Sequence, residues 1–238
     1  MSNGSVDLAH YRKELIQSLR RQRILKSPEI EEALSAIKRE DFLWPGTPSF
    51  EAYFDEPVAL GNTGQTISAP HMVTIMLEEL ELKPGMTVLE VGCGSGYNAA
   101  LLGYLMSRNL SSKSGFLVIS IERNRELVKF AKENIRKARL NELVSIVEGD
   151  GSLGYPSRSE DQRYDRIVVT AAAPSIPHFL EKQLKANGIL EIPVGHLGLQ
   201  SLLKLRKKQS DDKEYRMQRE EITGAIFVPL IGEDAYHS

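Results

Sequence analysis

Short apolar segments alternate with helical segments through the middle of the chain, and this pattern limits the fold more than any other feature. The apolar segments are runs of Val, Ile and Leu at residues 87–91, 116–121, 143–147, 166–170 and 188–194. Continuous apolar runs of this length between helices are typical of parallel strands that are buried on both faces. The pattern therefore predicts an α/β fold: a Rossmann-like, doubly wound and mostly parallel sheet of about seven strands.

The segments on either side of this core have other patterns. Residues 7–22 repeat leucines at helical spacing, and a second helix is expected after Ser27, so the chain begins with a helical arm. Residues 44–67 are irregular and rich in turn-forming residues, and long loops of this kind are often functional. The runs 199–206 and 222–230 have no helix between them, which predicts a terminal antiparallel hairpin with a charged tip.

Charge and cysteine content exclude several classes of protein. The 238 residues carry 30 Lys and Arg against 32 Asp and Glu, a formal net charge of −2. A dedicated nucleic-acid or membrane-surface binder would normally show a strong basic excess. The single cysteine, Cys93, excludes an internal disulfide and fits a reducing compartment, and no apolar run is long enough to span a bilayer. We therefore expect a cytoplasmic protein.

The strongest local motif follows the first apolar run. That run ends at Glu90 and Val91, and Gly92, Gly94 and Gly96 then precede a helical segment. Glycines in this position let the backbone turn tightly and approach a ligand at a helix N-terminus. A dinucleotide-binding G-x-G-x-x-G turn would need a third glycine one position later, where the chain has tyrosine. The segment instead resembles motif I of the S-adenosylmethionine-dependent methyltransferases; the alternative is a glycine-rich turn without a ligand.

Two carboxylates lie where the second and third strands are expected to end. Glu122 follows the run 116–121, where a carboxylate can accept hydrogen bonds from both hydroxyls of a ribose. It lies farther from the glycine motif than usual, and an inserted loop at 107–115 explains the excess. Asp150 lies between two glycines after the third strand and suits an adenine amino group. The alternatives are a charged helix start for Glu122 and a turn residue for Asp150.

Residues 64–71 read Gly-Gln-Thr-Ile-Ser-Ala-Pro-His and are the candidate substrate segment. Ser68 and Pro70 also fit a helix N-cap and a first-turn proline, which is a purely structural interpretation. Because the segment lies before the glycine motif in the sequence, it could fold over the open edge of the cofactor site. Ser68 is therefore a candidate for contact with the substrate.

Taken together, these motifs occur in an order that resembles the protein-L-isoaspartate O-methyltransferases. The motifs are segment 64–71, the glycine motif at 90–96, Gly-Asp-Gly at 149–151, Ala-Ala-Ala-Pro at 171–174, Ile-Pro-Val-Gly at 192–195 and Phe-Val-Pro-Leu at 227–230. The resemblance covers residues 10–233, and segment 64–71 is far more selective than the glycine motif. It implies methyl transfer from S-adenosylmethionine to the free α-carboxylate of an isoaspartyl residue. The ester then collapses to a succinimide, which partly hydrolyses to normal aspartate.

The resemblance also implies a role for each matching residue. Ser68 matches the active-site hydroxyl of the family, and Thr66, Ile67 and Ala69 would contact the isoaspartyl group beside it. The residues that would hold the cofactor are Glu90, Gly92, Gly94, Gly96, Glu122, Gly149 and Asp150. Cys93 lies where other small residues are common and is interpreted as a packing residue. The five histidines are scattered without ligand spacing, so no metal is expected.

The same resemblance implies one S-adenosylmethionine-dependent methyltransferase domain over residues 1–238. It would consist of N-terminal helices and a substrate loop (1–85), a cofactor-binding core (86–195), and closing strands with a tail (196–238). The expected partners are proteins and peptides that contain isoaspartyl residues. No nucleic acid, membrane or obligate partner is expected.

The chemistry of a carboxylate acceptor needs no general base, because an α-carboxyl group with a pKa of about 3.5 is already ionised at neutral pH. Two other functions stay open. One is methyl transfer to nucleic acid or a small molecule; an adenine-N6 enzyme would usually have an Asn/Asp-Pro-Pro-Tyr/Phe segment where this chain has Ala-Ala-Ala-Pro at 171–174. The other is a binding protein that keeps the fold without transfer, although no motif of the family is missing.

Overall fold

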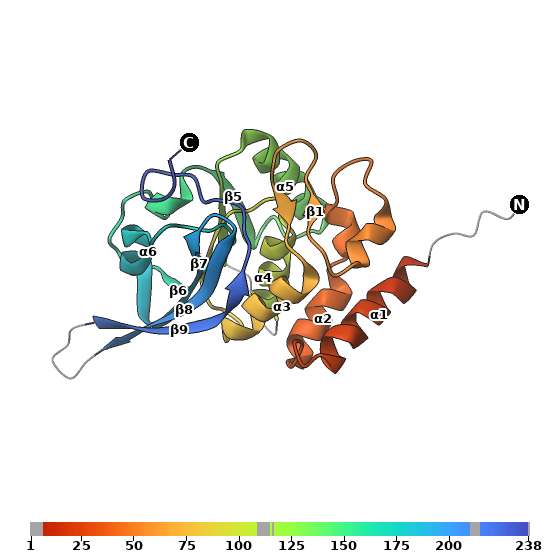
Figure 1. Ribbon diagram of the computed structural model, residues 1–238, viewed down its shortest axis with the longest axis horizontal. Helices are drawn as coiled ribbons and strands as arrows, with labels where there is room; N and C mark the ends of the chain where they lie inside the picture. Colours follow the sequence, from red (N-terminus) through yellow and green to blue (C-terminus); the bar gives the residue numbers. More distant parts are fainter. Residues whose placement is uncertain (1–6, 109–114, 116, 210–214, 238) are drawn as a thin grey trace, which may run out of the picture.

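A computed structural model describes residues 7–108, 115, 117–209 and 215–237. Its centre is a seven-stranded sheet in the order β5-β4-β3-β6-β7-β8-β9 (Figure 1). The strands are β3 (Val88–Val91), β4 (Val118–Glu122), β5 (Val144–Glu148), β6 (Tyr164–Val169), β7 (Leu184–His196), β8 (Leu199–Gln209) and β9 (Tyr215–Ala225). The predicted α/β class and mostly parallel sheet are confirmed. The expected insertion at 107–115 and the hairpin tip lie largely outside the described residues.

Strand order reverses at β3, which fixes where a ligand can bind. The chain proceeds from β3 to β4 and then β5 on one side, and β6 returns to pair with the other side of β3, all in parallel. In open α/β sheets, ligands bind outside the carboxyl ends of the strands at such a reversal. The glycine motif directly follows β3, so the fold places it at this point.

Three antiparallel strands close the sheet at the opposite edge from β5. β7 pairs with β8, and β8 pairs with β9 from Gln200↔Ala225 to Gln209↔Tyr215. The predicted terminal antiparallel hairpin is confirmed, but the bounds predicted for its last strand, 222–230, are wrong: β9 begins earlier, at Tyr215, and ends at Ala225. Residues 226–237, here called the closing segment, leave the sheet and cross over the carboxyl ends of the strands (Figure 1).

Alternating residues of the central strands point to two apolar cores, one on each face of the sheet. Val88 and Val168 belong to the core that is shared with most of the helices, whereas Leu89 and Val91 belong to the second core, with Leu180 of the short helix α6. The helices are α1 (Leu8–Arg21), α2 (Pro28–Ala36), α3 (Pro70–Glu79), α4 (Tyr97–Ser107), α5 (Arg125–Lys137) and α6 (His178–Gln183). Among the described residues, no helix is long and apolar enough to cross a membrane.

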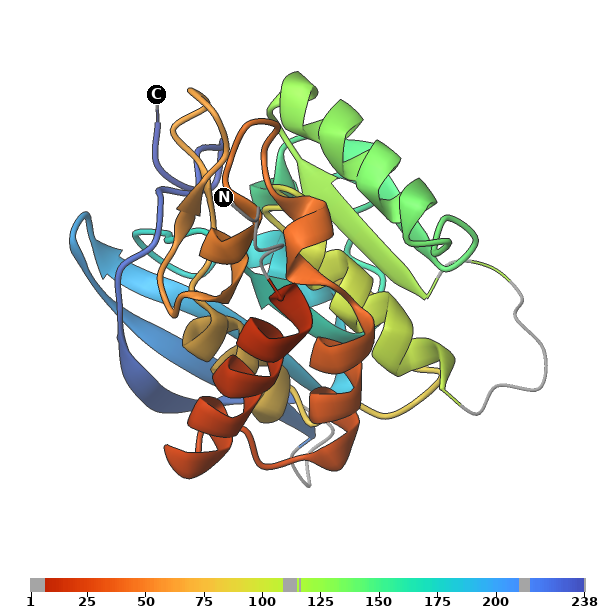
Figure 2. The same ribbon diagram turned by 90° about the vertical axis from the view of Figure 1, so that its right-hand side faces the viewer.

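The N-terminal arm ends in a small hairpin directly before α3. After α2 come two 3₁₀ helices, η1 (Arg39–Phe42) and η2 (Ser49–Tyr53), and then β1 (Val58–Ala59) pairs antiparallel with β2 (Thr66–Ile67). This hairpin lies within the stretch that the sequence predicted to be irregular. Figure 2 shows its loop, in orange, beside the blue closing segment, so two distant parts of the chain meet at one edge of the sheet.

Candidate active site

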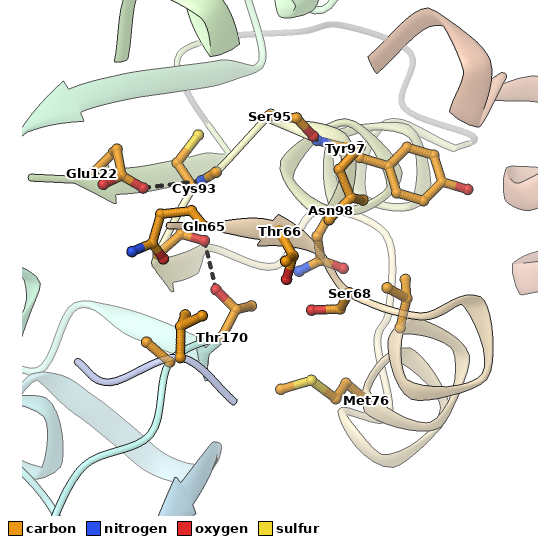
Figure 3. Close-up of a pocket in the computed structure, with 16 residues that line it drawn as sticks. Gln65, Thr66, Ser68, Met76, Cys93, Ser95, Tyr97, Asn98, Glu122 and Thr170 are labelled. Atoms are coloured by element: carbon orange, nitrogen blue, oxygen red, sulfur yellow. Dashed lines mark hydrogen bonds between the residues drawn. The ribbon is translucent and has the colours of Figure 1, made fainter. Parts of the chain in front are cut away.

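Three adjoining cavities lie at the carboxyl ends of β3, β4 and β6. The loop cavity lies between the glycine loop at 92–95, the segment 65–68 and Thr170 (Figure 3). The strand-end cavity extends from it past Glu122 toward residues 149–151, and a surface groove extends from it past Ser68 toward β9. The loop cavity shares wall residues with each of the other two, among them Glu122 with the strand-end cavity and Ser68 with the groove.

The glycine loop has a backbone that other residues would not tolerate. Gly92 and Gly94 have φ of +97° and +54°, in the left-handed region that favours glycine. A Cβ on Gly92 would lie 2.5 Å from Oγ1 of Thr170, a hydroxyl that donates to the Gly92 carbonyl oxygen at the same distance. The loop therefore needs glycine both for its turn and for its close approach to Thr170 after β6.

Glu122 is held rigidly at the boundary between the loop cavity and the strand-end cavity. Its carboxylate accepts hydrogen bonds from the backbone N–H of Gly94 at 3.0 Å and of Asn124 at 2.9 Å. The residue is 7% exposed and borders both cavities. A carboxylate has about four acceptor positions, so two remain for a ligand after these bonds. This is the placement expected for a group that binds ribose hydroxyls.

Glu90 does not border any of the three cavities. It is fully buried and accepts hydrogen bonds from Ser120 and, at 2.8 Å, from the Asn98 side-chain amide. Burial raises the pKa of Glu90 to about 7, with the nearby Glu122 carboxylate adding to the effect. Asn98 borders the loop cavity, and its buried Oδ1 has no hydrogen-bond partner among the described residues. Within the described part of the chain, the free hydrogen-bond acceptor at the wall of the loop cavity is therefore the side chain of Asn98 and not Glu90. Sequence analysis did not identify Asn98.

Asp150 anchors the closing segment. Its carboxylate accepts from the Ser152 backbone N–H and hydroxyl at 2.9 and 2.7 Å, and from the Glu233 backbone N–H at 2.7 Å. The neighbouring Gly149 borders the strand-end cavity, whereas Asp150 does not. Its side chain therefore acts on the cavity indirectly, by holding the segment that covers it.

The closing segment supplies the outer wall of the cavities. Leu230 and Val228 exchange backbone hydrogen bonds with Ala172 at 2.7 and 2.8 Å. Pro229, Leu230 and Ile231 then border the strand-end cavity, and Val228 borders the loop cavity. The sequence matched this stretch to the family but assigned it no site residue. Its apolar run is the signal that could have identified the wall.

Ser68 faces the cavities and does not cap a helix. Helix α3 begins at Pro70 with Ala69 in the N-cap position, so the structural interpretation of Ser68 as the cap is wrong. Thr66 and Ser68 border both the loop cavity and the surface groove. Ile67 is mostly buried yet still borders the loop cavity, and Ala69 borders the groove. The four residues predicted to contact substrate therefore lie at or beside the junction of the two.

The surface groove is apolar and open. Leu199 and Ile226 line it and are 77% and 79% exposed, and Phe227 lies beside them. An exposed apolar groove of this kind suits a polypeptide whose side chains can vary. No three His, Cys, Asp or Glu side chains in the described parts of the chain are placed to share a metal ion. Burial raises the pKa of the Cys93 thiol at the loop cavity, so the thiol stays protonated.

A known protein family matches nearly the whole chain. A family model described as protein-L-isoaspartate(D-aspartate) O-methyltransferase matches residues 10–235. A protein-L-isoaspartate O-methyltransferase of Staphylothermus marinus is 45% identical over 222 residues, 93% of this chain and 94% of that protein. One from Pyrococcus abyssi is 44% identical over 96% of this chain and 98% of its own length.

A solved structure extends the comparison to three dimensions. It is described as a putative protein-L-isoaspartate O-methyltransferase from Plasmodium falciparum in complex with S-adenosyl-L-homocysteine. It resembles this chain with a TM-score of 0.79 at 28% identity, and the match covers 93% of this chain and 99% of that one.

Proposed function

The chain belongs to the protein-L-isoaspartate(D-aspartate) O-methyltransferase family, and we propose that it transfers the methyl group of S-adenosylmethionine to the free α-carboxylate of L-isoaspartyl residues in damaged proteins. The proposal rests mainly on Thr66 and Ser68, where the loop cavity meets the surface groove. These residues border both the cavity behind the glycine loop and the open apolar groove. A carboxylate that enters from the groove therefore meets the loop cavity at the Ser68 side chain.

The residues present fit S-adenosylmethionine. Glu122 retains acceptor positions that suit two ribose hydroxyls. The unpartnered Oδ1 of Asn98 is a buried acceptor that suits an ammonium group, because a buried polar atom without a partner is costly. Leu230 and Ile231 provide an apolar wall for an adenine ring. Gly92 and Gly94 border the loop cavity without a side chain, whereas Gly96 packs against Ala131 of α5, and the carboxylate of Asp150 holds the closing segment in place.

In the proposed reaction, the Ser68 hydroxyl and the apolar residues around the site have different roles. When bound, S-adenosylmethionine supplies a methyl group that is activated by its positively charged sulfur. The Ser68 hydroxyl orients the substrate carboxylate, and the apolar groove and the closing segment exclude water from it. The carboxylate is already ionised, so no base has to remove a proton. Cys93 and Ser68 stay neutral and compete poorly for the methyl group.

The whole chain takes part in this proposal as one domain. Segment 65–68 belongs to the N-terminal part (1–85), the glycine loop to the core (86–195) and the closing segment to the last part (196–238), and all three border one loop cavity. The single, buried thiol supports a cytoplasmic location.

Paired peptides test the proposed function directly. Labelled S-adenosylmethionine is offered with two peptides that differ only in isoaspartate against aspartate. We expect label on the isoaspartyl peptide, released as methanol in mild alkali because a carboxyl ester is base-labile. The aspartyl peptide should take up little label, since a shift of about 1 Å in the reacting group can cost about a hundredfold in rate. Base-stable label on RNA with none on the isoaspartyl peptide would overturn the proposal.

A further inference from the structure

A buried arginine lies directly behind the candidate substrate site. Arg39 begins η1 and is 1% exposed. Its guanidinium donates to the Ser68 carbonyl oxygen at 2.8 Å and to the Glu56 carbonyl oxygen at 3.3 Å. Glu56 and Ser68 flank the hairpin of β1 and β2, so one side chain connects the two ends of the segment that carries the substrate residues.

Arg39 does not itself border the three cavities but lies behind Tyr97, which forms part of the wall of the loop cavity. Its guanidinium carbon is 5.6 Å from the centroid of the Tyr97 ring, and Tyr97 borders the loop cavity. Figure 3 shows Tyr97 and Ser68 on the side of the cavity away from Glu122. The positive charge of Arg39 is therefore on the substrate side of the site. It contacts the backbone carbonyl oxygen of Ser68, the residue whose hydroxyl faces the cavities.

The charge of Arg39 has no direct counter-ion among the described residues. No carboxylate lies within 4 Å of it, and its Nε has no acceptor in the described parts of the chain. The carboxylate that influences it from nearby is Asp55, which is engaged by the backbone N–H of His71 at 2.8 Å and by the His71 ring at 2.9 Å. An arginine stays charged in a protein, and a buried charge without a partner is costly. By contrast, Arg12 nearby forms an ion pair with Glu40 at 2.5 Å.

We propose that Arg39 is a positioning residue for the methyl acceptor: it fixes the Ser68 backbone, and its unpaired positive charge is balanced by the isoaspartyl carboxylate when the substrate binds. The inference rests on the proposed function, because it names what that carboxylate meets. It assigns Arg39 to binding of the acceptor and leaves the cofactor to Glu122 and Asn98. Loss of the charge should therefore raise KM for the peptide and leave the affinity for S-adenosylmethionine unchanged.

The chain offers a matched control in Arg166. This residue is also buried, and its guanidinium donates to the backbone carbonyl oxygens of Leu80, Glu81 and Asp165. It lies near the start of β6, whereas the cavities lie beyond the end of that strand. Replacing Arg166 removes a buried guanidinium with carbonyl contacts but should not alter acceptor binding.

The test compares Arg39→Gln, Arg39→Lys and Arg166→Gln with the wild type. Initial rates on an isoaspartyl peptide give KM and kcat, calorimetric titration gives the Kd of S-adenosylmethionine, and thermal melting gives Tm. We expect Arg39→Gln to raise KM at least about tenfold with Kd within about twofold. Arg39→Lys should raise KM by less than about tenfold, because it keeps the charge but loses the guanidinium contacts to the two carbonyl oxygens. Arg166→Gln should lower Tm without changing KM.

Several results would overturn the inference. They are an unchanged KM in Arg39→Gln, an equal rise in KM in Arg166→Gln, or a loss confined to kcat or Tm. If Arg39→Gln does not fold, Arg39→Lys decides alone: a tenfold rise in KM would refute the role of the charge. Failure of the wild type to methylate the isoaspartyl peptide would instead refute the proposed function, so the two failures are distinguishable.

Discussion

The carboxylate of Glu122 is the group whose removal tests the cofactor site most directly. Two of its acceptor positions are taken by the backbone N–H groups of Gly94 and Asn124, and about two remain toward the cavities. Glu122→Ala would therefore remove the partner of the ribose hydroxyls and also release the glycine loop. We expect weaker binding of S-adenosylmethionine.

The magnitude follows from the number of hydrogen bonds lost. A hydrogen bond to a charged group contributes roughly 1.5–3 kcal/mol, so two contribute at least about 3 kcal/mol. At about 1.4 kcal/mol per tenfold change, this corresponds to a roughly hundredfold rise in Kd. Water that enters the cavity of the alanine variant would replace part of the loss. We therefore expect a rise between about tenfold and about a hundredfold, measured by calorimetric titration of the folded variant.

Glu148 provides the control for this measurement. It ends β5 directly beside Glu122 in the sheet register, its side chain is 47% exposed, and it borders none of the three cavities. Glu148→Ala removes a neighbouring carboxylate and should change Kd by less than about twofold. A Kd for Glu122→Ala within twofold of the wild type, or an equal change in both variants, would remove Glu122 from the ribose site.

Three further outcomes are expected. Ser68→Ala should change the free energy of unfolding by less than about 0.5 kcal/mol, because Ser68 is not the helix cap, yet lower kcat/KM for the isoaspartyl peptide at least about tenfold; full activity would exclude its role. Burial raises the pKa of Glu90 from 4.5 to about 7, so the folded state loses stability as the pH rises between these values. In urea titrations, the free energy of unfolding of Glu90→Gln should rise relative to that of the wild type across this pH range and keep a constant difference above it. A difference between the two proteins that does not change with pH would contradict the shift. Gly92→Ala should lower Tm more than Gly64→Ala, because both positions have positive φ but only the first meets a neighbour, Oγ1 of Thr170 at 2.5 Å; equal losses would exclude the clash.

The parallel core could be predicted from the sequence because its strands are buried on both faces. Such strands read as continuous apolar runs, and runs such as 143–147 and 166–170 agree closely with β5 and β6. The last strand could not be located in this way. β9 is an edge strand whose residues are mostly exposed and polar, whereas the apolar run at 226–230 belongs to the closing segment. Its apolar residues cover cavities and do not extend the sheet.

Some residues of the candidate site could likewise be predicted from the sequence, and others could not. Gly92, Gly94 and Glu122 could be placed from the sequence because they follow strands whose carboxyl ends meet at one edge. Asn98 and Arg39 could not, because nothing in the local sequence shows that an amide faces a cavity or that an arginine is buried behind a serine. Such residues are defined by contacts between distant segments, such as the bond from Arg39 to the Ser68 carbonyl oxygen.

The closing segment has a consequence for how each molecule is made. The glycine loop and Glu122 leave the ribosome long before the wall at 228–231 has been synthesised. The wall also depends on Tyr236, whose backbone exchanges hydrogen bonds with Leu230 and Gly232. Contacts between residues so far apart in the sequence are the slowest to form. A nascent chain therefore lacks this wall of the strand-end cavity until the residues up to 236 have been synthesised, so the wall is the last part of the site that each new molecule can assemble.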